Sequence, residues 1–230
     1  MKALALVAAA LAGLLPVSDG GPAIGKLLIA RPQLTGFFGG TVIVLVDHSE
    51  TGSLGLIVNR PLELSVAELL PDLEGASQHH EHGWLGGPVA QTQLLLLVHA
   101  ASPPAGAARV LDGVYVSGSE GTLRALLAKA PKEGEFRAYV GYAGWAPGQL
   151  EAEIADGDWL LAPGDAAAVF AKEPAKLWQR LFDEHNAIEV RGPGRGLVSW
   201  EKSINLSAPW RSAAASSACP TSARARCSTR

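Results

Sequence analysis

Cysteine is scarce in this sequence and confined to one end of it. Cys219 and Cys227 are the only two cysteines among 230 residues. A cysteine-based metal site or disulfide framework is therefore excluded from residues 1–218. The two thiols could pair if the chain is exported, but a domain of this length buries enough apolar surface to fold without a disulfide.

The sequence also lacks a second long hydrophobic run and a surplus of basic residues in its main part. No segment after the N-terminal one reaches the ~18 apolar residues of a membrane span, so we expect no transmembrane anchor. The whole chain has a net charge of −3. Its last twenty residues hold four arginines and no acidic residue. Residues 1–210 therefore carry 15 basic and 22 acidic residues, a net charge of −7. This charge disfavours direct binding to DNA, and no helix-turn-helix signal is present.

Sequence signatures of common catalytic sites are missing as well. No G-x-S-x-G elbow occurs, and no P-loop spacing follows any glycine-rich stretch. Asp47, His48 and Ser49 have the residue types of a hydrolytic triad, but neighbours on a strand point to opposite faces, so we interpret them as a hairpin end. The sequence thus predicts no catalytic residue and leans against an enzyme. A site whose residues converge only in the fold is the alternative.

Metal-binding and nucleotide-binding patterns are weak. The cluster His79–His82 lacks the i, i+4 spacing of a helical zinc site, so we expect a solvated polar loop, no metal site and no cofactor. Gly86–Val89 is typical of a tight turn. Gly192–Gly196 is typical of a flexible loop, because no strand-to-helix unit surrounds it.

The two ends differ from the middle. Residues 1–23 hold Lys2, an apolar run and then small residues, the layout of a secretory signal. A helical extension or a wrongly assigned start is the alternative. Residues 207–230 are rich in Ala, Ser and Arg without a hydrophobic period, which predicts disorder. The folded domain is therefore expected over residues 24–206.

Apolar, β-branched segments alternate with short amphipathic ones through this domain. Strands are expected at 26–30, 41–47, 54–59, 93–100, 113–119 and 135–144, with a strand end or turn at 82–89 and a brief extended piece at 158–165. Short helices are expected after Ser65, where Glu68 completes a capping box, after Ser119, and at 147–157, 166–172 and 174–185. Strands and helices are interspersed without a regular βαβ alternation. The pattern predicts a single α+β domain with a large mixed, mainly antiparallel sheet flanked by helices.

The stretch from Tyr139 to Asp165 is rich in glycine and acidic residues. Gly141 and Gly144 allow a sharp bend, Tyr142 and Trp145 can cover the sheet edge, and Gln149 lies at a helix start. We interpret the stretch as a strand–turn–helix–strand corner. A ligand site at exposed helix-start amides is the alternative.

Asn59 and Arg60 end a central strand, where functional polar groups often gather. Arg60 is suited to a carboxylate or phosphate, and equally to a structural ion pair. The candidate ligand-binding residues are Asn59, Arg60, Gly141, Tyr142, Trp145 and Gln149.

Four blocks in this order resemble the YqgE/AlgH family of bacterial proteins: "GKLLIARPQL", "DHSETGSLGLIVNRPL", "GGPV" and "GYAGWAPGQLEAEIADGDWLLAPGD". The resemblance covers most of Gly25 to about Leu181. It implies an α+β fold with a large mixed sheet and a cytoplasmic location, but no established catalytic residues. One branch of the family is labelled a transcriptional regulator.

From the residues and the resemblance together we expect a non-catalytic regulatory or interaction domain that acts through an unknown protein or small-ligand partner. An enzyme or ligand-binding protein with a pocket near Asn59, Arg60 and the Gly141–Gln149 corner is the first alternative. A direct DNA-binding regulator is disfavoured. A true signal peptide in residues 1–20 would instead imply export to the periplasm.

Overall fold

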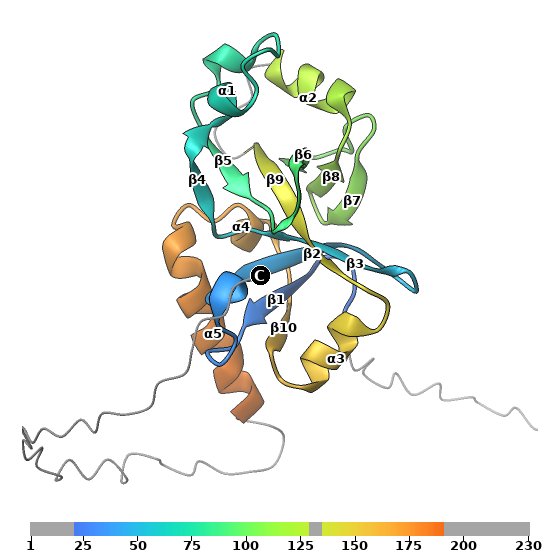
Figure 1. The fold of residues 1–230 in the computed structure, drawn as a ribbon, viewed down its shortest axis with the longest axis vertical. Coiled ribbons are helices and arrows are strands. Elements are labelled where there is room, and N and C mark those ends of the chain that lie inside the picture. The colour runs from blue at the N-terminus through green and yellow to red at the C-terminus, as the bar shows by residue number, and fades with distance from the viewer. Residues whose placement is uncertain (1–20, 129–134, 191–230) are drawn as a thin grey trace, which may run out of the picture. The chain divides into compact units, whose positions relative to one another are not determined.

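The structure of the protein is a computed structural model, and it describes residues 21–128 and 135–190 (Figure 1). The expected signal-like segment, the C-terminal tail, the loop at 192–196 and both cysteines lie outside these residues, except for residues 21–23. The predicted domain boundaries therefore stay predictions.

Strands dominate the described part of the chain. They are β1 (Lys26–Ala30), β2 (Val42–Ser49), β3 (Gly52–Ile57), β4 (Pro61–Ser65), β5 (His82–Leu85), β6 (Val89–His99), β7 (Ala108–Leu111), β8 (Val114–Ser117), β9 (Phe136–Trp145) and β10 (Trp159–Pro163). The helices are α1 (Val66–Leu69), α2 (Glu120–Leu127), α3 (Gln149–Ala155), α4 (Ala166–Val169) and α5 (Pro174–Val190), with 3-10 turns η1 (Gly36–Phe38) and η2 (Ala76–Gln78).

The strands form one ten-stranded mixed sheet, in which eight strands follow the order β10-β1-β2-β3-β9-β6-β8-β7. Outside this order, β5 pairs with β9, and β4 pairs with β5. All pairings are antiparallel except that of β5 with β9. The expected α+β fold with a large, mainly antiparallel sheet flanked by helices is confirmed.

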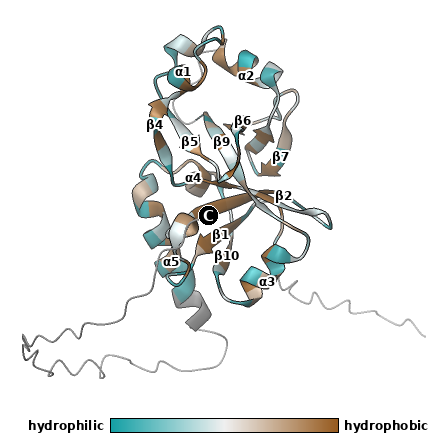
Figure 2. Cartoon of the chain, in the orientation of Figure 1, coloured by the Kyte–Doolittle hydropathy of each residue, from teal (hydrophilic) through white to brown (hydrophobic). Residues whose placement is uncertain are grey.

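Helices cover both faces of the sheet around β1 and β2, which explains why these strands are apolar at nearly every position. Leu27, Ile29 and Val44 face one core, which includes Leu177 and Leu181 of α5. On the opposite face, Leu28, Ile43 and Leu45 pack with Leu150 of α3 and with Trp159. Figure 2 shows β1 and β2 in brown and much of α2 and α3 in teal.

A third core lies under the small helices at the other end of the sheet. Leu96 and Val98 of β6 and Phe136 of β9 pack with Leu123 and Leu127 of α2, and Val66 of α1 joins them. The capping box predicted at Ser65 and Glu68 is present at the start of α1. Ser119 is the N-cap of α2 as expected, but its side chain makes no capping bond.

The sheet is curled so that strands at its two ends approach one another. Val110 and Leu111 of β7 lie against Gly25, just before β1, and a Cβ on Gly25 would lie 2.7 Å from the carbonyl oxygen of Val110. Leu111 also lies close to Gly164, just after β10. Small residues are therefore needed where the edges meet.

Strands β4 and β7 were missed by the sequence analysis. Both are short, and β4 begins with Pro61, which weakens the alternating pattern that identifies a strand. The strand expected at 135–144 is β9, which ends at Trp145, so Gly141 lies within the strand and the expected bend does not end it there.

A pocket where the β2–β3 hairpin meets β9

A β-bulge determines which side chains share a face of the β2–β3 hairpin. Leu45 pairs with Gly55, but Asp47 pairs with Leu54, so β2 contains one extra residue between these two pairs. The bulge shifts the register so that His48, and not Asp47, lies opposite Ser53. Residues directly opposite on antiparallel strands point to the same side of the sheet.

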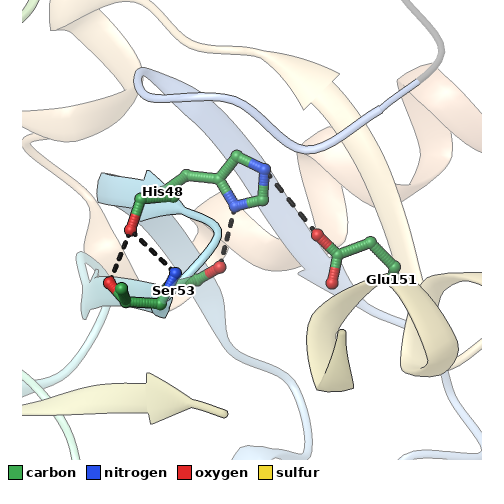
Figure 3. A network of polar contacts seen from close by, with 5 residues as sticks. His48, Ser53 and Glu151 are labelled. Atoms are coloured by element: carbon green, nitrogen blue, oxygen red, sulfur yellow. Dashed lines mark hydrogen bonds and ion pairs between the residues drawn. The ribbon is translucent and has the colours of Figure 1, made fainter. Parts of the chain in front are cut away.

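His48 connects the hairpin to helix α3 (Figure 3). Its Nδ1 atom lies 2.8 Å from the Oγ of Ser53. Its Nε2 atom lies 3.7 Å from the Oε1 of Glu151, a distance suited to charge attraction and too long for a direct hydrogen bond. The serine is buried, the His48 side chain is 22% exposed and that of Glu151 is 48% exposed. These three side chains thus lie at the border between the core and the solvent.

A shallow pocket of about 380 Å³ opens beside Ser53. We call it the corner pocket. Its walls are Asp47, Thr51, Gly52, Ser53, Leu54, Val89, Tyr142, Gly144 and Trp145. Val89 is an exposed apolar side chain, 39% accessible, and Tyr142 is half-buried. The pocket therefore combines aromatic and aliphatic walls with a few polar groups, the composition of many binding sites.

Glu153 of α3 holds the back of this corner in place. Its Oε2 accepts hydrogen bonds from the indole nitrogens of Trp145 and Trp159, both at 2.8 Å. The Gln149 side chain accepts from the Ala146 amide and donates to the Oε1 of Glu153. The predicted strand–turn–helix–strand corner is present, and its acidic run stabilises the corner through these bonds in addition to any helix-dipole effect.

Unusual backbone angles bring Val89 beside Tyr142. Ala90 has φ +48°, in the left-handed region, and Gly141 has φ +68°. A Cβ on Gly141 would lie 2.7 Å from the carbonyl oxygens of Gly87 and Val89, so this position requires glycine. Val89 pairs with Tyr142 on the other side of an irregularity in the β6–β9 ladder.

Asn59 and Arg60 bind a different segment, the loop before β2. Asn59 donates to the Gly40 carbonyl and accepts from the Val42 amide, both at 2.9 Å. Arg60 donates to the Gly39 carbonyl at 3.1 Å, and its guanidinium lies 5.2 Å from the ring centroid of Phe37. Partial burial lowers the pKa of Arg60 from its usual value.

The six candidate ligand-binding residues are thus distributed over several places. Tyr142 and Trp145 line the corner pocket, Gly141 shapes the strand beside it, and Gln149 supports it from α3. Neither Asn59 nor Arg60 is among the residues that line the pocket. Their shared role in ligand binding stays a prediction.

The histidine cluster is only partly the solvated loop that we expected. His80 and His82 are exposed, but His79 is 5% accessible and stacks edge-on against Phe136. Its Nδ1 lies 2.8 Å from Glu81 and its Nε2 lies 3.5 Å from the Leu127 carbonyl. Burial follows because η2 packs beside the end of α2. Within residues 21–128 and 135–190, no three His, Cys, Asp or Glu side chains group closely enough to hold a metal.

Arg137 of β9 is a buried cation that the sequence analysis missed. Its guanidinium donates to the carbonyl oxygens of Val58, Val169 and Ala171 at 2.7–3.0 Å and lies 3.6 Å from the Trp84 ring centroid. Burial lowers the pKa of Arg137. Burial likewise raises the pKa of the neighbouring Tyr139 hydroxyl, although the positive charge of Arg137 acts in the opposite direction.

A second, larger cavity of about 800 Å³ lies between the end of β6, the loop that precedes β7, and α2. Its described walls include His99, Pro103, Gly106, Ser119, Thr122 and Glu135. The Thr122 hydroxyl is already hydrogen-bonded to the Ala105 carbonyl and to Ser117. The Thr122 hydroxyl therefore helps to hold α2 against the loop that precedes β7 and against the end of β8.

Comparison with known proteins shows which protein family has this fold. A family model described as AlgH-like matches residues 27–187. The chain belongs to the AlgH-like family. A UPF0301 protein of Chlamydia pneumoniae is 36% identical over 161 residues, 70% of this chain and 85% of that protein. A UPF0301 protein of Myxococcus xanthus is 40% identical over 156 residues, 66% of this chain and 84% of that protein.

Solved AlgH-like structures share the fold. The solution structure of AlgH from Pseudomonas aeruginosa is 31% identical, covers 75% of this chain and 94% of that chain, and superposes with a TM-score of 0.60. Protein DIP2367 from Corynebacterium diphtheriae has the same TM-score at 23% identity, which supports the fold alone. The family resemblance read from the sequence is confirmed. Among the described residues, none of the helices combines the length and apolar composition of a membrane span.

The relation of His48 to Ser53 and Glu151 was missed because it depends on register and packing. The sequence predicts the hairpin, but the bulge leaves no clear signal in a run of apolar residues. Glu151 is 98 positions beyond Ser53, and only the packing of α3 against the hairpin brings them together. The adjacent serine, Ser49, bonds to Thr51 instead.

Proposed function

We propose that this AlgH-like chain is a non-catalytic interaction domain that binds a protein or small ligand at the corner pocket. The observation that carries the proposal is the combination of the exposed Val89, the half-buried Tyr142 and the exposed carboxylate of Asp47 around one opening. Recognition sites commonly join apolar anchors to a few fixed polar groups.

The rigidity of the corner supports the same proposal. Glu153 fixes two indole rings, and the left-handed backbone at Ala90 and Gly141 fixes the position of Val89. A surface that is already ordered loses less conformational entropy when a partner binds. Backbone strain in a non-glycine residue such as Ala90 is also commonly retained where it serves function.

Arg60 offers a second contact for an anionic group on a partner. Its guanidinium is partly exposed and stacks near the exposed Phe37 ring, and arginine–aromatic pairs are frequent in recognition surfaces. Asn59, with both side-chain groups bonded to the preceding loop, supports this surface from below and has no contact role in our proposal.

A regulatory role of the domain would be exerted through such a partner, with a cytoplasmic location. The net charge of −7 in residues 1–210 supports indirect action over direct contact with DNA. Fluorescence anisotropy with mixed duplex DNA at low salt tests this point. Salt-sensitive binding that survives deletion of residues 211–230 would contradict it. N-terminal sequencing of the mature protein separates the cytoplasmic location from export.

Partner capture with two matched variants tests the corner pocket. The full-length chain is immobilised as wild type, Val89→Glu and Leu64→Glu, and bound proteins and metabolites are identified by mass spectrometry. Val89 and Leu64 are both exposed apolar side chains on strands, 39% and 48% accessible, but only Val89 lines the pocket. We expect a binder that wild type and Leu64→Glu retain and Val89→Glu loses. Equal retention by all three proteins would overturn the proposal.

A further inference from the structure

The β-bulge in β2 directs the Asp47 side chain to the face of the sheet opposite α3. Asp47 pairs with Leu54, and Leu54 pairs with Gly144 of β9, so these positions form one row across three strands. The Leu54 side chain packs against the core that includes residues of α5. The next residue, His48, points the other way, toward Glu151 of α3 (Figure 3). Because paired residues share a face, Asp47 lies on the same face as Leu54.

The other end of this row is apolar. Gly144 is exposed, and a Cβ at this position would lie 3.2 Å from the Cε2 atom of Tyr142 and 3.9 Å from the Cγ2 atom of Val89. The Tyr142 ring, which packs against the same core as Leu54, and the Val89 side chain thus flank Gly144. The corner pocket therefore has an apolar end at Tyr142 and Val89 and an acidic end at Asp47.

The Asp47 carboxylate is available to a ligand. Asp47 is exposed and lines the pocket. Within residues 21–128 and 135–190, no basic side chain forms an ion pair with it. The net charge of −7 in residues 1–210 also attracts cations to the surface of the domain. The two carboxylate oxygens can thus accept hydrogen bonds from a cation that enters the pocket.

We propose that the corner pocket binds an arginine side chain of a partner protein. The inference rests on the proposed function, because it names the chemical group that enters the same pocket. The methylene stem of the arginine packs between Tyr142 and Val89, and its guanidinium donates to the Asp47 carboxylate. Gly144 and Asp47 are two strand spacings of about 4.8 Å apart, so only a long side chain contacts both ends of the pocket.

Two features of the pocket favour arginine from a protein over other cations. The planar guanidinium pairs with both oxygens of a carboxylate and is more weakly hydrated than the ammonium of lysine. The pocket is shallow, so a free organic cation would remain largely in water. A side chain of a protein is held in addition by contacts around the rim, which offset the entropy lost on binding.

Titration of the nitrogen-15-labelled full-length protein with a short, end-capped peptide that contains one arginine tests the proposal. We expect saturable shift changes at the backbone amides of Asp47, Leu54 and Tyr142. The same peptide with citrulline, which has the shape of arginine without its charge, should bind about tenfold more weakly or worse. A peptide whose arginine is shortened by two methylene groups should also bind about tenfold more weakly, because less apolar stem is buried.

A matched pair of variants tests the role of Asp47. Asp47→Asn preserves the shape of the side chain and removes its charge, so it should weaken binding of the arginine peptide by about tenfold or more. Binding of the citrulline peptide should change little. Glu50→Gln is the control, since Glu50 is an exposed carboxylate of the same hairpin that does not line the pocket, and it should bind the arginine peptide as wild type does.

Three outcomes would contradict the inference. Equal affinity for the arginine and citrulline peptides, or equal affinity of wild type and Asp47→Asn for the arginine peptide, would overturn it. Propylguanidinium, the same side chain without a peptide, should bind more weakly than the peptide, and equal binding would overturn the assignment to a protein partner. If the arginine peptide fails to bind while Val89→Glu still loses its captured partner, only the identity of the bound group is wrong and the binding site stands.

Discussion

His48 and Ser53 lie opposite each other across the β2–β3 hairpin because β2 has one extra residue between its pairs with Gly55 and Leu54. A regular continuation of the first pairing would place Asp47 opposite Ser53. The bulge thus decides whether an imidazole or a carboxylate contacts the serine hydroxyl. Bulges often redirect side chains in this way beside functional sites.

The His48–Ser53 contact should contribute modestly to stability. We expect Ser53→Ala to lower the free energy of unfolding by about 1 kcal/mol, the usual net value of one hydrogen bond. Urea denaturation of wild type and variant measures this. A loss several times larger would show that the contact contributes more than one ordinary hydrogen bond and would contradict this expectation.

Glu153 should hold the two indole rings of the corner. In Glu153→Gln we expect the Trp145 and Trp159 indole N–H signals to move in proton–nitrogen spectra, because both donate to Oε2. Hydrogen bonds to a charged acceptor contribute about 1.5–3 kcal/mol, so the free energy of unfolding should fall by a similar amount. Glu173→Gln, which alters an exposed pair with Lys176, is the control and should leave both signals in place.

The buried guanidinium of Arg137 should be essential for stability. In Arg137→Met two buried carbonyl oxygens and one partly buried carbonyl oxygen lose their donor, and we expect a loss of about 3 kcal/mol or more. Arg124→Met removes an exposed pair with Glu120 and should cost much less. Chemical denaturation of the two variants compares them directly, and equal stability would show that the bonds of Arg137 are not needed.

Tyr139 should make the fold sensitive to strongly alkaline solution. Burial raises the pKa of its hydroxyl above the usual 10.0. Above the usual pKa the Tyr139 hydroxyl loses its proton in the unfolded chain but keeps it in the folded chain. The unfolded state then binds fewer protons than the folded state, so the free energy of unfolding falls as the pH rises. We expect Tyr139→Phe to show a smaller loss of unfolding free energy between about pH 9 and about pH 11. Parallel curves for the two proteins would refute this.

Asn59 and Arg60 should separate into a structural and a surface residue. Asn59→Ala leaves the Gly40 carbonyl and the Val42 amide without their partner, and we expect a loss of about 1–3 kcal/mol. Arg60→Ala should change stability less, because one carbonyl bond and one ring contact are lost at a partly exposed site. Thermal unfolding tests the order, and the reverse order would assign the structural role to Arg60.

Local signals in the sequence predicted much of this fold. Strand β1 was predicted with its observed bounds, and the capping box at Ser65 identified the start of α1. Such features depend on neighbouring residues, so they are visible without the fold. The long apolar run at 41–47 also predicted the strand β2, whose side chains enter cores on both faces of the sheet.

The candidate site depended on long-range contacts that carry little local signal. Tyr142 and Trp145 were identified from their glycine-rich surroundings, and both line the pocket. Ser53 and Val89 were not, since the pocket forms only where β3, β6 and β9 meet. Arg137 was missed for the same reason, because its three carbonyl partners come from segments 32–79 positions away.

Chemical-shift mapping with a fragment library tests the corner pocket most directly. The full-length protein, labelled with nitrogen-15, is titrated with small aromatic and acyl fragments, and shifts are followed for the backbone and the Trp145 indole. We predict that the largest changes cluster at Asp47, Ser53, Val89 and Tyr142 and disappear in Val89→Glu. Changes that instead cluster at Ser119 and Thr122, around the larger cavity, would contradict the account.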